Sequence, residues 1–222
     1  MRMRLIAILL ASFIPCISWS QDIDIDYGMK GWYLGGGAGI ANVYSWTDYG
    51  WGSADYGDSD AAYTITGGYR FMPYFAVEAA WLDSGTPTWN RDLVYVGNLL
   101  DVYNVDASID LSAYQVSAVG ILPFAKIWEV YIRGGASVWD GTSSQVLTRV
   151  SDGQVTLRTI DDTGVSFLLG VGAGVKLGHN WQIRVDYSYY GIQDDLLVVS
   201  SGDSAYTDFG ALQVVYRFGD DW

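Results

Sequence analysis

The sequence predicts an all-β fold, in which an antiparallel meander of eight strands crosses a membrane as a closed β-barrel. Two observations predict it. Apolar and polar residues alternate through segment after segment, and the connections between segments are alternately short and long. Beyond the N-terminal segment the longest apolar run is residues 165–175, "VSFLLGVGAGV", which is too short for a membrane-spanning helix.

The first 20 residues predict a cleaved signal peptide. Two arginines in "MRMR" precede an apolar run, and Ser18 and Ser20 provide small residues before a cleavage site. A transmembrane anchor is the less favoured alternative, because the run is short for a bilayer span. Cleavage removes Cys16, the one cysteine, so the mature chain from Gln21 is exported without disulfides. Residues 21–30 are expected to form a short periplasmic segment before the barrel.

Eight alternating segments, rich in Val, Ile, Tyr, Phe and Trp, predict the strands. They cover residues 31–46, 60–72, 74–83, 106–124, 128–141, 163–178, 181–192 and 204–218. The short connections are "MPY", "PFAK" and "LGHN". The long polar ones, predicted as loops, are residues 47–60, 84–101, 141–162 and 193–203. Strands joined by short turns at one end and long loops at the other are typical of membrane barrels.

Each segment has an apolar face and a polar face, because successive side chains of a strand point in opposite directions. The clearest apolar faces are Tyr63, Ile65, Tyr69 and Phe71; Phe75, Val77, Ala79 and Trp81; Trp128, Val130, Ile132, Ala136 and Val138; Val165, Phe167, Leu169 and Val171; and Trp181, Ile183, Val185, Tyr187 and Tyr189. In the fourth segment Ile109, Leu111 and Ala113 share one parity, and Tyr114 and Val116 share the other. This change of phase predicts a bulge near residues 112–114, or a strand that leaves the membrane there.

The apolar face is predicted to point outward into lipid. The opposite face holds Arg, Glu, Asp, Lys, Ser and many Gly residues, which suit a packed polar interior better than a water-facing surface. Aromatic residues gather at the strand ends, as two membrane–water interfaces require. Near the short turns these are Trp32, Phe71, Trp128, Trp181, Tyr216 and Phe218, and near the long loops Trp46, Tyr63, Trp81, Trp139 and Tyr189. A soluble β-sandwich or lipocalin-like barrel is the less favoured alternative.

The segments "GWYLGGGAGIA", "GGYRF", "FAVEAAW" and "ALQVVYRF" resemble those of the OmpA-type eight-stranded barrels of the Gram-negative outer membrane. The resemblance covers residues 31–218. It implies an OmpA-like, porin-like monomer in the outer membrane, in contact with lipid and lipopolysaccharide. It also implies assembly by the barrel-assembly machinery, because the last strand resembles that machinery's C-terminal signal, carried here by Leu212, Val214, Tyr216 and Phe218. Residues 219–222, "GDDW", leave open whether Phe218 or Trp222 is read. The peptidoglycan-binding domain of longer OmpA relatives is expected to be absent.

Charged residues on the inward faces form the candidate site. They are Arg70, Glu78, Glu129, Arg133, Lys176, Arg184, Asp186 and Arg217. We favour a packed core of paired charges, because an unpaired buried charge is costly and an eight-stranded barrel is narrow. The resemblance implies the alternative, a salt-bridge gate in which Glu78 faces Arg133 or Arg184.

Composition excludes several functions. The 12 basic residues are scattered among 25 acidic ones, with a formal net charge of −13, which argues against nucleic-acid binding. "GGGAG" and "GVGAG" lie inside alternating strands without the lysine or helix of a nucleotide site, and no cofactor is expected. One His, His179, and one Cys exclude Cys/His metal clusters and argue against an enzyme, since barrel enzymes nearly all use a histidine base beside a partner.

The long loops are acidic. They contain Asp48, Asp55, Asp58, Asp60, Asp161, Asp162, Asp194, Asp195 and Asp203. Simple solvation is favoured over divalent cations that bridge these carboxylates to lipopolysaccharide phosphates. The predicted function is therefore a structural or surface-interaction role, with an extracellular loop partner that the sequence does not identify. The alternative is a narrow pore for ions or very small solutes.

Overall fold

The computed structural model describes residues 30–49, 52–95, 102–124, 127–192 and 204–218, and these ranges contain nine strands. The strands are β1 (Gly31–Tyr49), β2 (Gly52–Met72), β3 (Phe75–Asp83), β4 (Thr88–Tyr95), β5 (Val102–Phe124), β6 (Trp128–Arg149), β7 (Val155–Leu177), β8 (Trp181–Ile192) and β9 (Ser204–Arg217). Within these ranges no helix is long and apolar enough to span a membrane.

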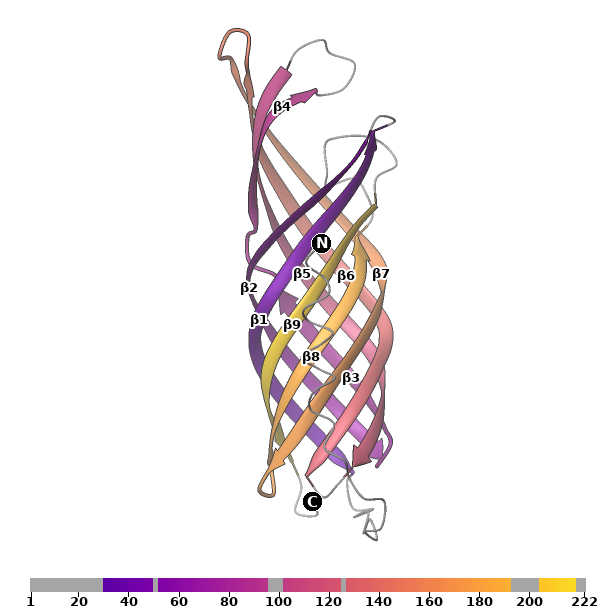
Figure 1. The fold of residues 1–222 in the computed structure, drawn as a ribbon. Helices are drawn as coiled ribbons and strands as arrows, with labels where there is room; N and C mark the ends of the chain where they lie inside the picture. The colour runs from indigo at the N-terminus through magenta and orange to yellow at the C-terminus, as the bar shows by residue number, and fades with distance from the viewer. Residues whose placement is uncertain (1–29, 50–51, 96–101, 125–126, 193–203, 219–222) are drawn as a thin grey trace.

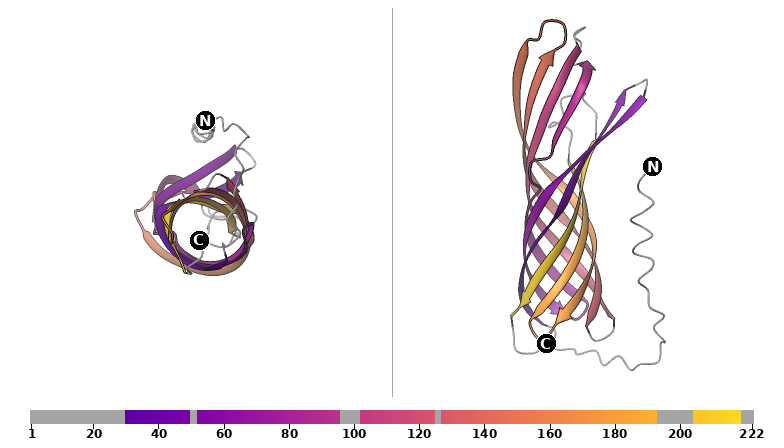
Figure 2. Two further views of the ribbon diagram at one scale, coloured as in Figure 1. Left: turned by 90° about the horizontal axis from the view of Figure 1, so that it is seen from below. Right: turned by 60° about the vertical axis from the view of Figure 1, so that its left-hand side comes forward.

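Eight of the strands close into a ring in which every neighbouring pair is antiparallel. The order runs β3-β2-β1-β9-β8-β7-β6-β5, and pairing of β3 with β5 closes it. Figure 2 shows the ring from one end. β4 is an additional strand that pairs with β5 beyond the ring, where Thr88 lies opposite Ser108 (Figure 1). The predicted eight-stranded meander barrel is confirmed.

The predicted short turns all lie at one end of the barrel, the short-turn end. Pro73 and Tyr74 join β2 to β3, and residues 178–180 join β7 to β8. Gly178 has a φ of +70°, a left-handed conformation that glycine adopts without strain. β5 and β6 are separated by only three residues, 125–127.

At the other end, three of the four predicted long connections contain long stretches of strand, so the strands extend further from the ring than the sequence predicted. β1 pairs with β2 as far as Tyr49 and Gly52, so most of residues 47–60 is strand. Residues 141–162 form the upper parts of β6 and β7, joined by a turn at Gly153, and residues 84–101 contain β4. These upper hairpins project beyond the ring in Figures 1 and 2. The fourth predicted loop, 193–203, lies outside the described residues.

These connections were misassigned because their strands do not alternate regularly between an apolar and a polar face. A strand that rises out of the membrane no longer needs an apolar outer face, so the strict alternation that marks a lipid-facing strand is lost. In "TSSQVLTR" and "VTLRTIDD" only the β-branched residues and the short apolar alternations indicate strand.

The predicted bulge in the fourth segment is also wrong. β5 pairs with β6 without interruption from Tyr103 to Phe124, and with β3 from Ser112 to Gly120. Ile109, Leu111 and Ala113 point into the barrel, on the same side as the polar residues lower on the strand. The change of phase therefore marks the place where the strand leaves the membrane, the other possibility that the pattern allowed.

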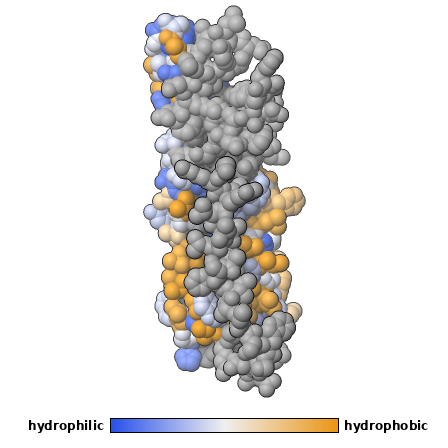
Figure 3. Space-filling model, in the orientation of Figure 1, coloured by the Kyte–Doolittle hydropathy of each residue, from blue (hydrophilic) through white to orange (hydrophobic). Residues whose placement is uncertain are grey.

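The outward faces near the short-turn end form an apolar belt, visible as orange on the lower part of the surface that Figure 3 displays. Of the predicted aromatic girdles, Trp32, Phe71, Trp128, Trp181, Tyr63 and Tyr189 are exposed in this belt. Trp139 is not. It is 1% exposed and points inward, and a Cβ on Gly164 would lie 2.4 Å from its ring. Its sequence position near a loop suggested the girdle, but its parity, shared with Glu129 and Arg133, places it inside.

Candidate functional site

The lower part of the lumen is organised around Glu129 of β6, which is 0% exposed. Its carboxylate accepts hydrogen bonds from Arg70 Nη1 of β2 at 2.9 Å, Arg217 Nη2 of β9 at 2.8 Å and Gln182 Nε2 of β8 at 2.5 Å. Arg70 also donates to the carbonyl of Pro73, which links this cluster to the β2–β3 turn. One carboxylate thus connects four strands across the barrel.

A second cluster lies above it, around Glu78 of β3. Glu78 Oε1 accepts hydrogen bonds from Arg184 Nη1 of β8 and from the Tyr33 hydroxyl of β1, each at 2.7 Å. Arg133 Nη1 of β6 lies 3.9 Å from Glu78 Oε2, and its other terminal nitrogen donates to Ser188 Oγ. Arg184 is therefore the near partner of Glu78, and Arg133 the more distant one.

Arg184 connects the two clusters. Its Nη2 lies 4.0 Å from Glu129 Oε1, while Nη1 is held by Glu78. The guanidinium also lies over the rings of Tyr33 and Tyr131, 4.9 and 5.2 Å from their centroids. Cation–π contacts of this kind favour a charge that is removed from water.

Two other predicted inward residues lie at the margins of these clusters. Asp186 of β8 is buried and interacts electrostatically with Arg133 and Arg184. Lys176 is half-buried near the lower end of β7, directly opposite Gln182 in the register. The interior of the barrel therefore combines carboxylates and guanidinium groups on at least five strands.

Sequence reasoning missed Tyr33, Gln182 and Tyr131, although a signal for them was present. Each lies against a glycine of a neighbouring strand. A Cβ would lie 2.4 Å from the Tyr33 ring at Gly68, 2.4 Å from the Tyr131 ring at Gly172 and 2.3 Å from Gln182 Nε2 at Gly174. Inward glycines thus mark the places where a large neighbouring side chain fills the lumen.

An apolar cluster fills the lumen above the ion pairs. Its members are buried on β1–β3 and β5–β9: Ala41, Ala62, Leu82, Ile109, Leu111, Ala113, Trp139, Leu168, Tyr190, Phe209 and Ala211. This upper lumen resembles the interior of a soluble barrel, with large rings among small alanines. Buried polar side chains, among them Ser143, Gln145 and Thr207, lie between these residues, so a hydrated ion would have to displace closely packed side chains to pass.

Several carboxylates of the upper hairpins accept hydrogen bonds from the protein itself. Asp60 accepts hydrogen bonds from the backbone N–H groups of Thr86 at 2.8 Å and Ala61 at 2.7 Å, and these hold its pKa below the ordinary value. Asp161 accepts a hydrogen bond from the Thr142 hydroxyl. Among the residues that the structure describes, no three His, Cys, Asp or Glu side chains form a group that could hold a metal ion.

Other acidic positions cannot be placed. The side chains of Asp48, Asp55 and Asp58, and the whole of Asp194, Asp195 and Asp203, lie outside the described residues. The idea that the acidic hairpins bind divalent cations therefore stays a prediction. His179 is exposed in the β7–β8 turn, as expected from "LGHN".

Comparison with known proteins identifies the family. The sequence model of the family described as outer membrane protein beta-barrel domain matches residues 7–218. The chain belongs to this family. It is therefore an outer-membrane β-barrel protein, and the apolar belt is the surface that faces the lipid of that membrane.

The chain is similar to several known proteins. Outer membrane protein A of Yersinia pseudotuberculosis serotype I (strain IP32953) is 28% identical over 192 residues, which are 86% of this chain and 49% of that protein. The chain thus spans about half the length of this curated relative. Neisserial surface protein A has the same fold, with a TM-score of 0.50 and 15% identity over 85% of this chain and 97% of its own. Ail of Yersinia pestis aligns with a TM-score of 0.47 and 13% identity, over 86% of this chain and all of its own.

Proposed function

We propose that this protein is a non-conducting outer-membrane barrel whose upper hairpins interact with partners at the cell surface, and that it is not an enzyme. The observation that carries the proposal is the filled lumen. Two buried ion-pair clusters lie across its lower part, and the apolar cluster fills its upper part. A solute would have to displace both the ion-pair clusters, which are charged, and the cluster above them, which is mainly apolar.

The ion pairs serve the barrel as internal cross-links. Glu129 and Glu78 join strands that are far apart around the ring, such as β3 with β8 and β6 with β9. Buried carboxylates and guanidinium groups require one another, because an unpaired charge in this interior is costly. A packed polar core therefore explains Arg70, Arg133, Arg184, Asp186 and the two glutamates without a gate.

A salt-bridge gate is the second candidate, and one observation favours it. Arg184 has two carboxylates within 4.0 Å, and Arg133 lies 3.9 Å from Glu78, so Glu78 could exchange one guanidinium for the other. The exchange would open only the lower lumen. The apolar cluster would still close the path above it, which is why we favour the structural role.

The surface role is supported by the hairpins that rise above the belt. β6 and β7 extend to Arg149 and Val155, and their outer face carries exposed apolar side chains, with Leu157 77% exposed and Val155 57% exposed. Large apolar side chains in water, on a rigid hairpin, are typical of surfaces that contact another molecule. We infer that an extracellular partner binds there. The acidic residues of the same hairpins are solvated by water, or are bridged by divalent cations to lipopolysaccharide phosphates.

Export and assembly follow from the two ends of the chain. We infer that the signal peptide is cleaved after Ser20, that residues 21–30 stay in the periplasm, and that the barrel is a monomer. Leu212, Val214 and Phe218 are exposed along β9, in phase with Tyr216, and the Phe218 N–H still donates to the Trp32 carbonyl at 2.9 Å. We propose that the barrel-assembly machinery reads these four residues, with Phe218 as the terminal aromatic.

The conductance of the mature chain, Gln21 to Trp222, in a planar bilayer tests the lumen. We expect no discrete openings from the natural protein or from Glu78→Gln, which keeps the shape of the side chain while removing its charge. Asp152→Asn, at an exposed ion pair on the β6–β7 hairpin, is the matched control. Openings that change with Glu78→Gln but not with Asp152→Asn would overturn the proposal in favour of the gate.

The terminal aromatic can be tested in cells. Phe218→Ala should lower the amount of folded barrel in the outer membrane several-fold, because it removes the outward ring that directly follows β9 and lies 5.0 Å from the Tyr216 ring. Trp222→Ala should leave that amount unchanged. Heat-modifiable migration of outer-membrane fractions measures the folded barrel, and the reverse ranking of the two variants would assign the signal to Trp222.

A further inference from the structure

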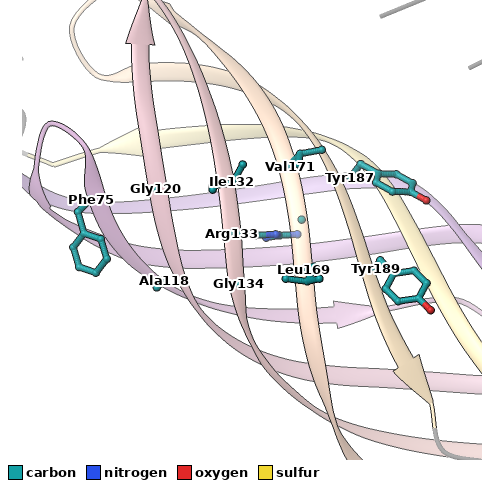
Figure 4. Close-up of a pocket in the computed structure, with 11 residues that line it drawn as sticks. Phe75, Ala118, Gly120, Ile132, Arg133, Gly134, Leu169, Val171, Tyr187 and Tyr189 are labelled. Atoms are coloured by element: carbon teal, nitrogen blue, oxygen red, sulfur yellow. The ribbon is translucent and has the colours of Figure 1, made fainter. Parts of the chain in front are cut away.

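The lipid-facing wall is hollowed across β3, β5, β6, β7 and β8. The hollow has a volume of about 680 Å³ and is lined almost entirely by outward side chains of the apolar belt. Figure 4 shows Phe75 at one end and Tyr187 and Tyr189 at the other, with Gly120 and Gly134 between them. It is a groove in the outer surface of the barrel, distinct from the lumen.

The strand register arranges this groove as two adjacent rows. The first row is Phe75, Gly120, Ile132, Val171 and Tyr187, each directly opposite the next. The second row contains Ala118, Gly134, Leu169 and Tyr189. Between the aromatic rings at its ends, the groove combines the small residues Gly120, Ala118 and Gly134 with the exposed aliphatic side chains of Ile132, Leu169 and Val171.

The length and direction of the groove suit a lipid chain. Four strand spacings of about 4.8 Å make the first row about 19 Å long, and three make the second about 14 Å long. Half of the hydrocarbon core, the depth that one lipid chain covers, is about 15 Å. The rows start at Phe75, the first residue of β3 at the short-turn end, and climb to the tyrosines of β8. Tyrosine rings that end in a hydroxyl are suited to the boundary between chains and headgroups.

The packing of the barrel does not require the two outward glycines. A Cβ at Gly134 would lie 3.8 Å from Leu169 Cδ2, and one at Gly120 would lie 3.5 Å from Ile132 Cγ1, which are ordinary contact distances. The inward neighbour Gly135 differs, since a Cβ there would lie 2.0 Å from the Val116 carbonyl oxygen. Side chains at Gly120 and Gly134 would therefore fill only the hollow on the lipid side.

A polar group lies in the floor of the groove. Arg133 belongs to the lining although it is only 5% exposed, and among the described residues its Nε has no hydrogen-bond partner. Gly170 lies over it, where a Cβ would be 2.8 Å from that nitrogen, so the wall is thin at this point. The guanidinium lies behind this thin wall, on the lumen side, where Glu78 and Ser188 are its partners.

We propose that the upper part of this groove, from Gly120 and Gly134 to Tyr187 and Tyr189, binds one acyl chain of an outer-leaflet lipid, with the lipid headgroup at the tyrosine end. The site lies within the belt that contacts lipid in any case. It differs from the rest of the belt because the chain lies in a recess between side chains instead of against a convex wall. The proposal depends on the barrel lying in the membrane and is independent of whether the lumen conducts.

Native mass spectrometry of the protein, purified from outer membranes in mild detergent, measures the lipid that each barrel retains. We expect one retained lipid on the natural protein and about a tenfold lower bound fraction on Gly134→Leu, since leucine occupies the middle of the groove. Gly120→Leu is the second variant and should behave alike. Gly36→Leu is the matched control, because Gly36 also faces outward, on the far side of the ring, and a Cβ there has nothing nearer than 3.8 Å.

Each outcome decides between distinct explanations. Loss of lipid from Gly134→Leu and Gly120→Leu, with Gly36→Leu unchanged and all three heat-modifiable, supports the site. Equal retention in the three variants, or no lipid on the natural protein, leaves only general contact with the bilayer and overturns it. A dimeric natural protein that becomes monomeric in Gly134→Leu would assign the groove to a second copy of the chain, which also overturns it.

Discussion

Replacing Glu129 with alanine is expected to lower the free energy of unfolding of the barrel by about 3–5 kcal/mol. The carboxylate accepts hydrogen bonds from Arg70, Arg217 and Gln182, and it is completely buried. Its removal leaves two guanidinium groups in the lower lumen without their closest negative charge. Urea unfolding of the protein in lipid vesicles, followed by tryptophan fluorescence, measures the change.

The matched control is Asp152→Ala, which breaks the pair with Arg149 at 3.2 Å on the β6–β7 hairpin. This pair has exposed side chains, 30% for Arg149 and 52% for Asp152, so we expect a loss below about 1 kcal/mol. Equal effects of the two substitutions would mean that the lower lumen contains enough water to solvate the guanidinium groups. The filled-lumen proposal would then fail together with the stability prediction.

Replacing Gly135 with valine is expected to prevent the barrel from closing. Any Cβ at this inward position would lie 2.0 Å from the Val116 oxygen and 2.7 Å from the Ser117 Cα, and both atoms belong to the β5 backbone. Backbone of a strand that is paired on both edges cannot move away without breaking its ladder. The heat-modifiable folded band should therefore be absent after refolding in detergent.

Gly134→Ala, one residue earlier on the same strand, is the control. Its Cβ would point into lipid, with the Leu169 side chain at 3.8 Å as its nearest neighbour, and the folded band should be retained. A folded Gly135→Val barrel would show that β5 and β6 can separate locally, in contradiction to the continuous register from Tyr103 to Phe124.

The sequence was sufficient for much of the fold because a lipid-facing strand obeys a simple rule. One face must be apolar and the other must fill a narrow lumen, so parity alone placed Glu78, Glu129 and Arg184 inside. The same rule failed above the belt, where β4 and the upper parts of β6 and β7 do not alternate regularly between an apolar and a polar face. Trp139 was misplaced when its nearness to a loop was given more weight than its parity.

The partners within the site could not be predicted in the same way. Whether Glu78 pairs with Arg184 or Arg133 depends on the stagger between β3, β8 and β6 around the ring, and a single sequence does not contain that stagger. The Tyr33 and Gln182 contacts depend on it too. The sequence indicates these contacts only through Gly68 and Gly174, the glycines that make room for the two side chains. The strands contain many other glycines, so these two could not be distinguished from the rest.

The unbroken pairing of β5 with β6 has a consequence for the position of the protein in its membrane. These strands pass from hydrocarbon into water without a turn, bulge or change of register. Only the side chains change: the outer face turns from apolar to mostly polar, and apolar residues join polar ones on the inner face. The bilayer surface therefore has no backbone landmark on this wall. Because β5 and β6 are hydrogen-bonded to each other along their whole length, a thinner or thicker bilayer would border on paired backbone in either case. A mismatch in thickness would therefore change the exposure of a few side chains and break no backbone hydrogen bonds.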